Sequence, residues 1–199
     1  GVGPGHEVIV PARSFFATAS CVASVGATPI FADVLSPSQN IDPASVERMI
    51  TPNTKAVICV HLAGWPCDMA ALGDICERHD LFLIEDCAQA HGAAIDGRKV
   101  GTFGDAASFS FCTDKIMSTG GEGGLLVMRD EAAHQRAWSL KDHGKNPQKI
   151  SDGKGMPGQF RYIHDSLGSN ARMTEMQAAI GRAQLRKLPD WLAARRANA

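Results

Sequence analysis

Residues 107–124 read ASFSFCTDKIMSTGGEGG, an apolar segment followed by one lysine and a glycine-rich turn. The first residues alternate between small and aromatic side chains, which predicts a strand that is covered on both faces. Lys115 follows the carboxyl end of this strand, the edge where ligands bind in doubly wound sheets. The glycines within residues 120–124 allow a sharp turn or a close approach to a ligand. We therefore predict that Lys115 is the reactive residue, although a lysine in such a turn is more often solvated.

The composition is that of a globular protein rather than a fibrous or disordered one. Of the 199 residues, 44% are hydrophobic and 21% are charged, which is enough apolar material for one sizeable core. Twenty Lys and Arg residues against 21 Asp and Glu residues give a net charge of -1, so no basic field favours nucleic acid as a partner. The longest apolar runs have only strand length and no signal for secretion opens the chain, so we expect a cytoplasmic protein without membrane insertion.

The cysteines and histidines show no spacing that is typical of a metal site. Six cysteines are scattered without a CxxC pair, which favours reduced and mostly buried thiols over a disulfide framework. The seven histidines include no HExxH motif or comparable spacing. We therefore expect no metal.

The order of predicted elements alternates between strands and helices. Such alternation predicts an α/β sandwich around a mostly parallel sheet. Residues 141–169 lack periodicity, so they are expected to be a functional or partly mobile loop, and Pro189 is expected to break or kink the last helix. The predicted strands are 7–10, 28–33, 56–60, 81–84, the strand that opens residues 107–124, and 124–128. The predicted helices are 12–25, 43–50, 68–79, 130–140 and 173–188.

Three predicted loops meet at one edge of this sheet, and together they carry the parts of a pyridoxal phosphate site. A lysine can form a Schiff base with an aldehyde, a carboxylate can keep a ring nitrogen protonated, an aromatic face can stack on a flat ring, and hydroxyls can bind phosphate. Each part has a simpler interpretation as a turn cap, a core residue or a local hydrogen bond. The residues are Phe15 and Phe16, Asp86 and Gln89, and Lys115 with Ser108 and Ser110.

Five segments spread over nearly the whole chain resemble the DegT/DnrJ/StrS family of PLP-dependent sugar aminotransferases. The resemblance implies the fold type I, aspartate-aminotransferase-like architecture, a three-layer sandwich, and a homodimer. The segments are GVGPGHEVIVPARSFFATASCVASVGATPIFADV, NIDPASVERMITPNTKAVICVHLAGWPCDM, LIEDCAQAHGA, GRKVGTFGDAASFSFCTDKIMSTGGEGG and LGSNARMTEMQAAIGRAQL.

The resemblance also implies a role for individual positions. Lys115 matches the Schiff-base lysine, and Asp86 matches the partner of the pyridine nitrogen. Phe15 matches the residue that stacks on the ring. The remaining matches are Gln89 near the phenolic oxygen, Ser110 as a phosphate ligand, and Asn170, with Arg172, on a loop that reaches the phosphate of the neighbouring subunit. The family usually has aromatic residues where this chain has Ser169 and Ala171.

The same resemblance implies that this chain is a large domain without its neighbours. We expect residues 1–190 to form the PLP-binding large domain and residues 191–199 to begin the connection to a smaller C-terminal domain. The family's N-terminal segment, with a Gly/Ser/Thr turn that binds phosphate, has no counterpart here. The fragment alone is therefore expected to be inactive.

The leading functional hypothesis is transfer of an amino group from an amino acid, expected to be glutamate, to a keto sugar of a nucleotide sugar. Some relatives that dehydrate sugars carry His at the lysine position, so Lys115 favours transamination. A keto cyclitol as acceptor and a non-catalytic regulatory or binding protein of the same fold stay open as alternatives. A Rossmann dehydrogenase is disfavoured because no GxGxxG motif follows the first strand.

Overall fold

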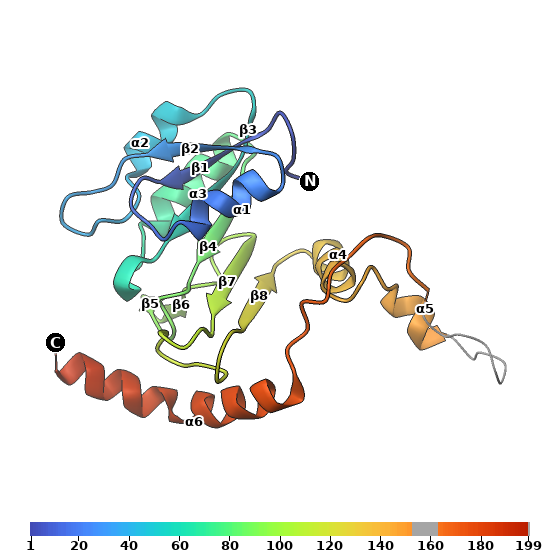
Figure 1. The fold of residues 1–199 in the computed structure, drawn as a ribbon. Helices are drawn as coiled ribbons and strands as arrows, with labels where there is room; N and C mark the ends of the chain where they lie inside the picture. Colours follow the sequence, from blue (N-terminus) through green and yellow to red (C-terminus); the bar gives the residue numbers. More distant parts are fainter. Residues whose placement is uncertain (153–162, 199) are drawn as a thin grey trace, which may run out of the picture.

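The computed structural model describes residues 1–152 and 163–198. These residues form one six-stranded sheet, a two-stranded hairpin, and helices on both faces of the larger sheet (Figure 1). The strands are β1 (Glu7–Pro11), β2 (Thr28–Ala32), β3 (Thr54–Val60), β4 (Phe82–Asp86), β5 (Ala94–Ile95), β6 (Arg98–Lys99), β7 (Ala106–Ser110) and β8 (Gly124–Met128). The helices are α1 (Ala17–Ser24), α2 (Pro43–Met49), the short 3-10 helix η1 (Leu62–Gly64), α3 (Met69–Arg78), α4 (Glu131–Lys141), α5 (Pro147–Asp152) and α6 (Glu175–Ala197).

The larger sheet is mostly parallel, as the alternating pattern predicts. Its strand order is β2-β1-β3-β4-β7-β8. Neighbouring strands from β2 to β7 are parallel, whereas β8 runs antiparallel to β7, with Ala106 opposite Met128. The carboxyl ends of β1, β3, β4 and β7 therefore lie at one edge of the sheet, where the sequence places its candidate site residues.

Side chains of the central strands alternate between two apolar cores. Ile9, Val57 and Leu83 pack with residues of α2 and α3 on one face of the sheet. Val8, Val10, Ala56 and Ile58 pack with Val22 of α1 on the other face. Continuous apolar strands of this kind are typical of a sheet that is covered on both sides. The predicted three-layer sandwich is confirmed for this part of the chain.

Capping residues determine where several helices begin. Asp42 precedes Pro43, the first residue of α2, and its carboxylate accepts a hydrogen bond from the Ala44 amide at 3.0 Å. Thr174 begins α6 with a reciprocal pair of hydrogen bonds to Gln177, the capping-box arrangement. These signals can be read from the sequence because each depends on residues within one turn.

Three local predictions are corrected. The helix predicted over 12–25 begins only at Ala17, because the preceding residues form the turn that leaves β1. The segment 141–169 is not all loop, since α5 lies within it, and residues 153–162 of that prediction lie outside the described residues. Of the break or kink predicted at Pro189, the break is wrong, because α6 continues through it to Ala197. Proline removes one helical hydrogen bond, and the bonds and contacts on either side maintain the helix.

Candidate active site

Asp86 ends β4 and points to the face of the sheet that α1 covers. Its Oδ2 accepts a hydrogen bond from the Thr18 hydroxyl at 3.5 Å, and Oδ1 accepts one from the Ala88 amide at 3.0 Å. The Thr18 hydroxyl is in turn hydrogen-bonded to that of Ser14 at 2.6 Å. Asp86 thus caps its own turn and also joins the loop after β1 to the end of β4.

Phe15 and Phe16 lie on the loop between β1 and α1 and are not core residues. Their side chains are 77% and 79% exposed. The Phe15 carbonyl accepts a hydrogen bond from the Thr18 amide at 3.0 Å, so the loop is tied to the start of α1 while its aromatic faces remain uncovered. An exposed aromatic at a ligand-binding sheet edge is available to stack on a flat ring.

Lys115 lies on the turn that follows β7, the strand next to β4. The two strands pair in a register that sets Asp86 opposite Ser108. The Lys115 ammonium donates to a carboxylate oxygen of Asp114 at 3.1 Å, and this hydrogen bond holds the pKa of Asp114 below its usual range. The turn is closed by a hydrogen bond from the Lys115 amide to the Cys112 carbonyl. The lysine therefore follows the strand end, as the sequence predicts.

Ser110 and Gln89 also lie at this edge, each in a local hydrogen bond. The Ser110 hydroxyl accepts from the Cys112 amide at 3.3 Å. The Gln89 side-chain oxygen accepts from the Ala63 amide at 2.6 Å, which ties the loop after β4 to the loop after β3. The partner of Gln89 is a backbone group far away in the chain, so no sequence pattern predicts it.

The structure does not bring Asn170 to the other candidates. Its side-chain oxygen accepts from the Arg172 side chain at 3.0 Å, and its backbone pairs with that of Asp142. Asp142 also forms ion pairs with Lys145 at 3.0 Å and with Arg172 at 3.3 Å. These ion pairs hold the segment around Arg172 beside the end of α4.

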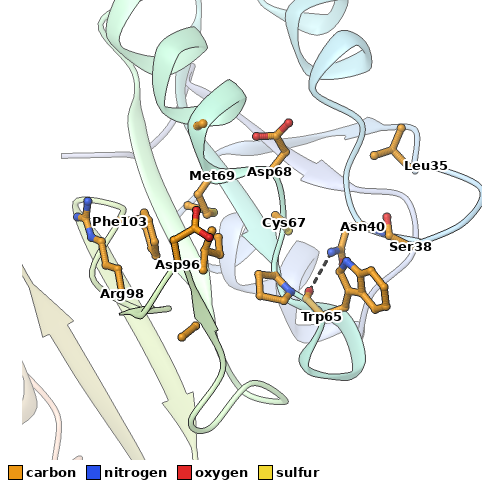
Figure 2. Close-up of a pocket in the computed structure, with 14 residues that line it drawn as sticks. Leu35, Ser38, Asn40, Trp65, Cys67, Asp68, Met69, Asp96, Arg98 and Phe103 are labelled. Atoms are coloured by element: carbon orange, nitrogen blue, oxygen red, sulfur yellow. Dashed lines mark hydrogen bonds between the residues drawn. The ribbon is translucent and has the colours of Figure 1, made fainter.

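Two cavities lie near this edge. The larger, of about 940 Å³, is lined by the loop 35–40, by residues 65–70, by the β5-β6 hairpin and by Phe103 (Figure 2). None of the site residues predicted from the sequence lines it, although the structure describes all of them. The smaller, of about 470 Å³, lies between the turn of Lys115 and α6, where Gln184 and Trp191 contribute to its wall. The chemistry of the side chains, not cavity size, therefore locates the candidate site.

Sequence reasoning missed a buried polar cluster behind Asp86. Glu85 and His61 are fully buried and hydrogen-bonded to each other at 3.0 Å. They and Cys87 present possible ligand atoms that lie within 4.8 Å of one another. Backbone amides already occupy the remaining positions of Glu85 and His61, so hydrogen bonding explains the cluster without a metal ion.

Comparison with known proteins decides the family. All 199 residues match the model of the DegT/DnrJ/EryC1/StrS aminotransferase family. The chain belongs to this family. Its fold agrees closely with that of an aminotransferase from Psychrobacter cryohalolentis, with a TM-score of 0.96 and 50% sequence identity over 99% of this chain and 50% of that one.

Two curated relatives carry names from different functional classes. A GDP-perosamine synthase of Caulobacter vibrioides is 43% identical over 98% of this chain and 49% of its own length. A "pleiotropic regulatory protein" of Geobacillus stearothermophilus is 42% identical over 100% of this chain and 50% of its own length. The chain thus spans about half the length of these relatives. Among the described residues, no helix is long and apolar enough to cross a membrane.

Proposed function

We propose that this chain is the large-domain part of a PLP-dependent aminotransferase that transfers an amino group from an amino acid, such as glutamate, to a keto sugar carried by a nucleotide. The observation that carries the proposal is the position of Asp86. It is hydrogen-bonded to Thr18 at the end of β4, and β4 pairs with β7, the strand that leads to Lys115. Family membership and the GDP-perosamine synthase relative support the same reaction class.

The side chains at this edge fit pyridoxal phosphate as a set. Asp86 supplies a carboxylate for the pyridine nitrogen, Phe15 supplies an exposed ring for stacking, and Ser110 supplies a hydroxyl for the phosphate. Gln89 lies on the loop that would reach the phenolic oxygen. When bound, the cofactor supplies an electron sink that stabilises negative charge on the substrate carbon.

Lys115 has two roles in this proposal. Its amine would hold the cofactor before the amino donor arrives, and the released amine would then take up and return the proton at the substrate carbon. In the structure the Lys115 ammonium donates a hydrogen bond to Asp114. Asn170 is proposed to act across a homodimer, on the phosphate of the neighbouring subunit, because its own contacts lie away from Asp86.

The proposal is tested with the full-length protein. Added PLP should give the visible absorption band of a lysine-bound cofactor, glutamate should bleach it, and a nucleotide keto sugar should restore it with formation of the amino sugar. Lys115→Ala should lose the band. A band that survives Lys115→Ala, or a loaded protein that aminates no nucleotide keto sugar, would contradict the proposal.

A regulatory role is the second candidate, because a relative with 42% identity carries a regulatory name. A protein that only regulates needs neither an amine at position 115 nor a carboxylate at position 86. Binding of PLP without turnover of any amino donor would favour this alternative over the enzyme.

A further inference from the structure

Glu85 is a carboxylate placed inside the protein with a donor at every available position. Its side chain has no exposed surface, and its Oε1 accepts hydrogen bonds from the amides of Phe103 and Gly104, both at 2.7 Å. Its Oε2 accepts from the Gly101 amide at 2.7 Å and from His61 at 3.0 Å. A buried carboxylate with four donors holds the segments that donate to it firmly together, because charge-assisted hydrogen bonds are stronger than neutral ones.

The balance of burial and hydrogen bonding keeps this carboxylate ionised. Burial alone raises the pKa of Glu85, but the hydrogen bonds from His61 and from the amides of Gly104 and Gly101 together lower it below its usual range. Protonating the carboxylate would set a hydrogen against one of its four donors, which is costly in a low-dielectric interior.

His61 connects Glu85 to the loop after β3. Its Nδ1 accepts a hydrogen bond from the Cys67 amide at 3.0 Å. Because a backbone amide can only donate, Nδ1 carries no hydrogen, and the ring is neutral with its hydrogen on Nε2, directed at Glu85. The backbone amide of His61 also donates to the Asp86 carbonyl at 3.1 Å. One residue therefore connects the ends of β3 and β4 with the approach to α3.

The loop held by His61 and Cys67 then contacts Gln89. The Ala63 amide donates to the side chain of Gln89, and Ala63 has a φ of 53°, which most residues avoid. Gly64 has a φ of 82°, and a Cβ added to it would lie 3.1 Å from the Gln89 carbonyl oxygen. The loop thus approaches the segment after Asp86 closely, in a conformation that a hydrogen-bonded anchor must maintain.

We propose that Glu85 and His61 are positioning residues that act from the opposite face of the sheet to hold Asp86 and Gln89 in their cofactor-binding positions. This inference rests on the proposed function, since it concerns the same site. Neither residue touches the cofactor in this account. Both act through the backbone ends of β3 and β4.

The test uses the full-length protein with Glu85→Gln, whose amide group replaces one acceptor oxygen with a donor that faces further donors. PLP affinity should fall about tenfold or more, which is the effect of removing the hydrogen-bond partners of ligating residues at metal sites. In the cofactor-free protein, amide hydrogen exchange at Ala63 and Ala88 should accelerate. His61→Gln, which keeps a donor for Glu85 but not the contact with the Cys67 amide, should change both quantities in the same direction and serves if Glu85→Gln fails to fold.

Val46→Ala is the matched control, because it removes apolar contacts from the fully buried core of α2 on the same face of the sheet. It should lower the melting temperature without weakening PLP binding. Equal PLP affinity and unchanged exchange in the Glu85 and His61 variants, or equal losses in Val46→Ala, would overturn the inference. Wild-type protein that binds no PLP would overturn the proposed function, and hydrogen exchange would still decide whether Glu85 positions these amides.

Discussion

At the scale of single residues, Glu85 and Asp86 are neighbours in the chain with opposite environments. Successive side chains of a strand point to opposite faces, so Glu85 enters the core beside His61 while Asp86 contacts Thr18 of α1. The first carboxylate is fully buried and the second is only half-buried. Two identical functional groups therefore take a structural and a candidate catalytic role because of strand geometry alone.

His91 is a second buried residue with a measurable consequence. It is 5% exposed, and its ring packs against Phe109 and Phe111 with centroids 5.6 and 5.8 Å away. Neither ring nitrogen has a hydrogen-bond partner among the described residues. Burial lowers the pKa of His91 from its ordinary value of 6.5, and it outweighs the nearby Ser110 backbone, which acts in the opposite direction; the charge of Lys115 also lowers the pKa.

The sign of the effect on stability follows from proton linkage. Because the unfolded chain binds this proton more readily than the folded protein, the contribution of His91 is complete above its ordinary pKa of 6.5 and is lost as the pH falls through the lowered folded value. His91→Leu should therefore flatten the dependence of the unfolding midpoint on pH below about 7, measured by chemical denaturation of the full-length protein. His134→Gln, at an exposed position of α4, is the control. If the unfolding midpoint of His91→Leu depends on pH as steeply as that of the wild type, another group controls the loss of stability at acidic pH.

Residue patterns locate part of the candidate site and miss the rest for a physical reason. Lys115 and Asp86 could be placed at the sheet edge because Asp86 ends one strand and Lys115 lies in the turn after the neighbouring one. Glu85 and His61 could not, since their partners are backbone amides whose positions depend on the folded turn 101–104 and the loop before α3. Asn170 lies apart from the other candidates in this chain, so its proposed role depends on a second subunit.

At the scale of elements, the join between β4 and β7 depends on a close backbone contact. A Cβ added to Gly104 would lie 2.5 Å from the Leu83 carbonyl oxygen, and backbone atoms cannot move aside as a flexible side chain can. The Gly104 amide is also one of the donors to Glu85. The turn before β7 is therefore packed onto β4 by both shape and hydrogen bonding.

Two glycine substitutions test this packing. Gly104→Ala should lower the free energy of unfolding by about 1–3 kcal/mol or more, because the clash forces a backbone shift. Gly73→Ala in α3 should raise it by about 0.5–1 kcal/mol, since alanine is the better helix former and the added methyl group meets no atom within 4 Å. Equal effects of the two variants, measured by denaturant titration of the full-length protein, would contradict the contact at Leu83.

Elements could be predicted wherever a local pattern decides them. The strands of the large sheet follow from short apolar runs, and α2 follows from Asp42 and Pro43. The sequence does not predict α5 because its six residues carry no apolar periodicity, and the effect of Pro189 cannot be predicted because it depends on the surrounding helix. The antiparallel direction of β8 has no signature in its own sequence.

At the scale of the whole molecule, much apolar surface of this chain is uncovered. Leu125 and Leu126 of β8 are 51% and 49% exposed, and Met176 of α6 is 77% exposed. Figure 1 shows α6 running along the end of the sheet where β7 and β8 lie, and Gln177 and Gln184 hydrogen-bond to the turn between these strands. Exposed patches of this kind are typical of surfaces that other parts of a protein cover.

The division of the chain stays a prediction. Residues 1–190 are proposed as the PLP-binding large domain, and residues 191–199 as the start of the connection to a smaller domain. α6 crosses this boundary without interruption. Relatives about twice as long supply the reason to expect further parts around the cofactor, including donors for a phosphate with about two negative charges.

Chemical trapping shows directly whether Lys115 carries the cofactor. Full-length protein loaded with PLP is reduced with sodium borohydride, digested, and analysed by mass spectrometry. We expect one cofactor-labelled peptide, which contains Lys115, and no such label in Lys115→Arg. Label on Lys99 or Lys141 instead, or label that persists undiminished in Lys115→Arg, would contradict this expectation.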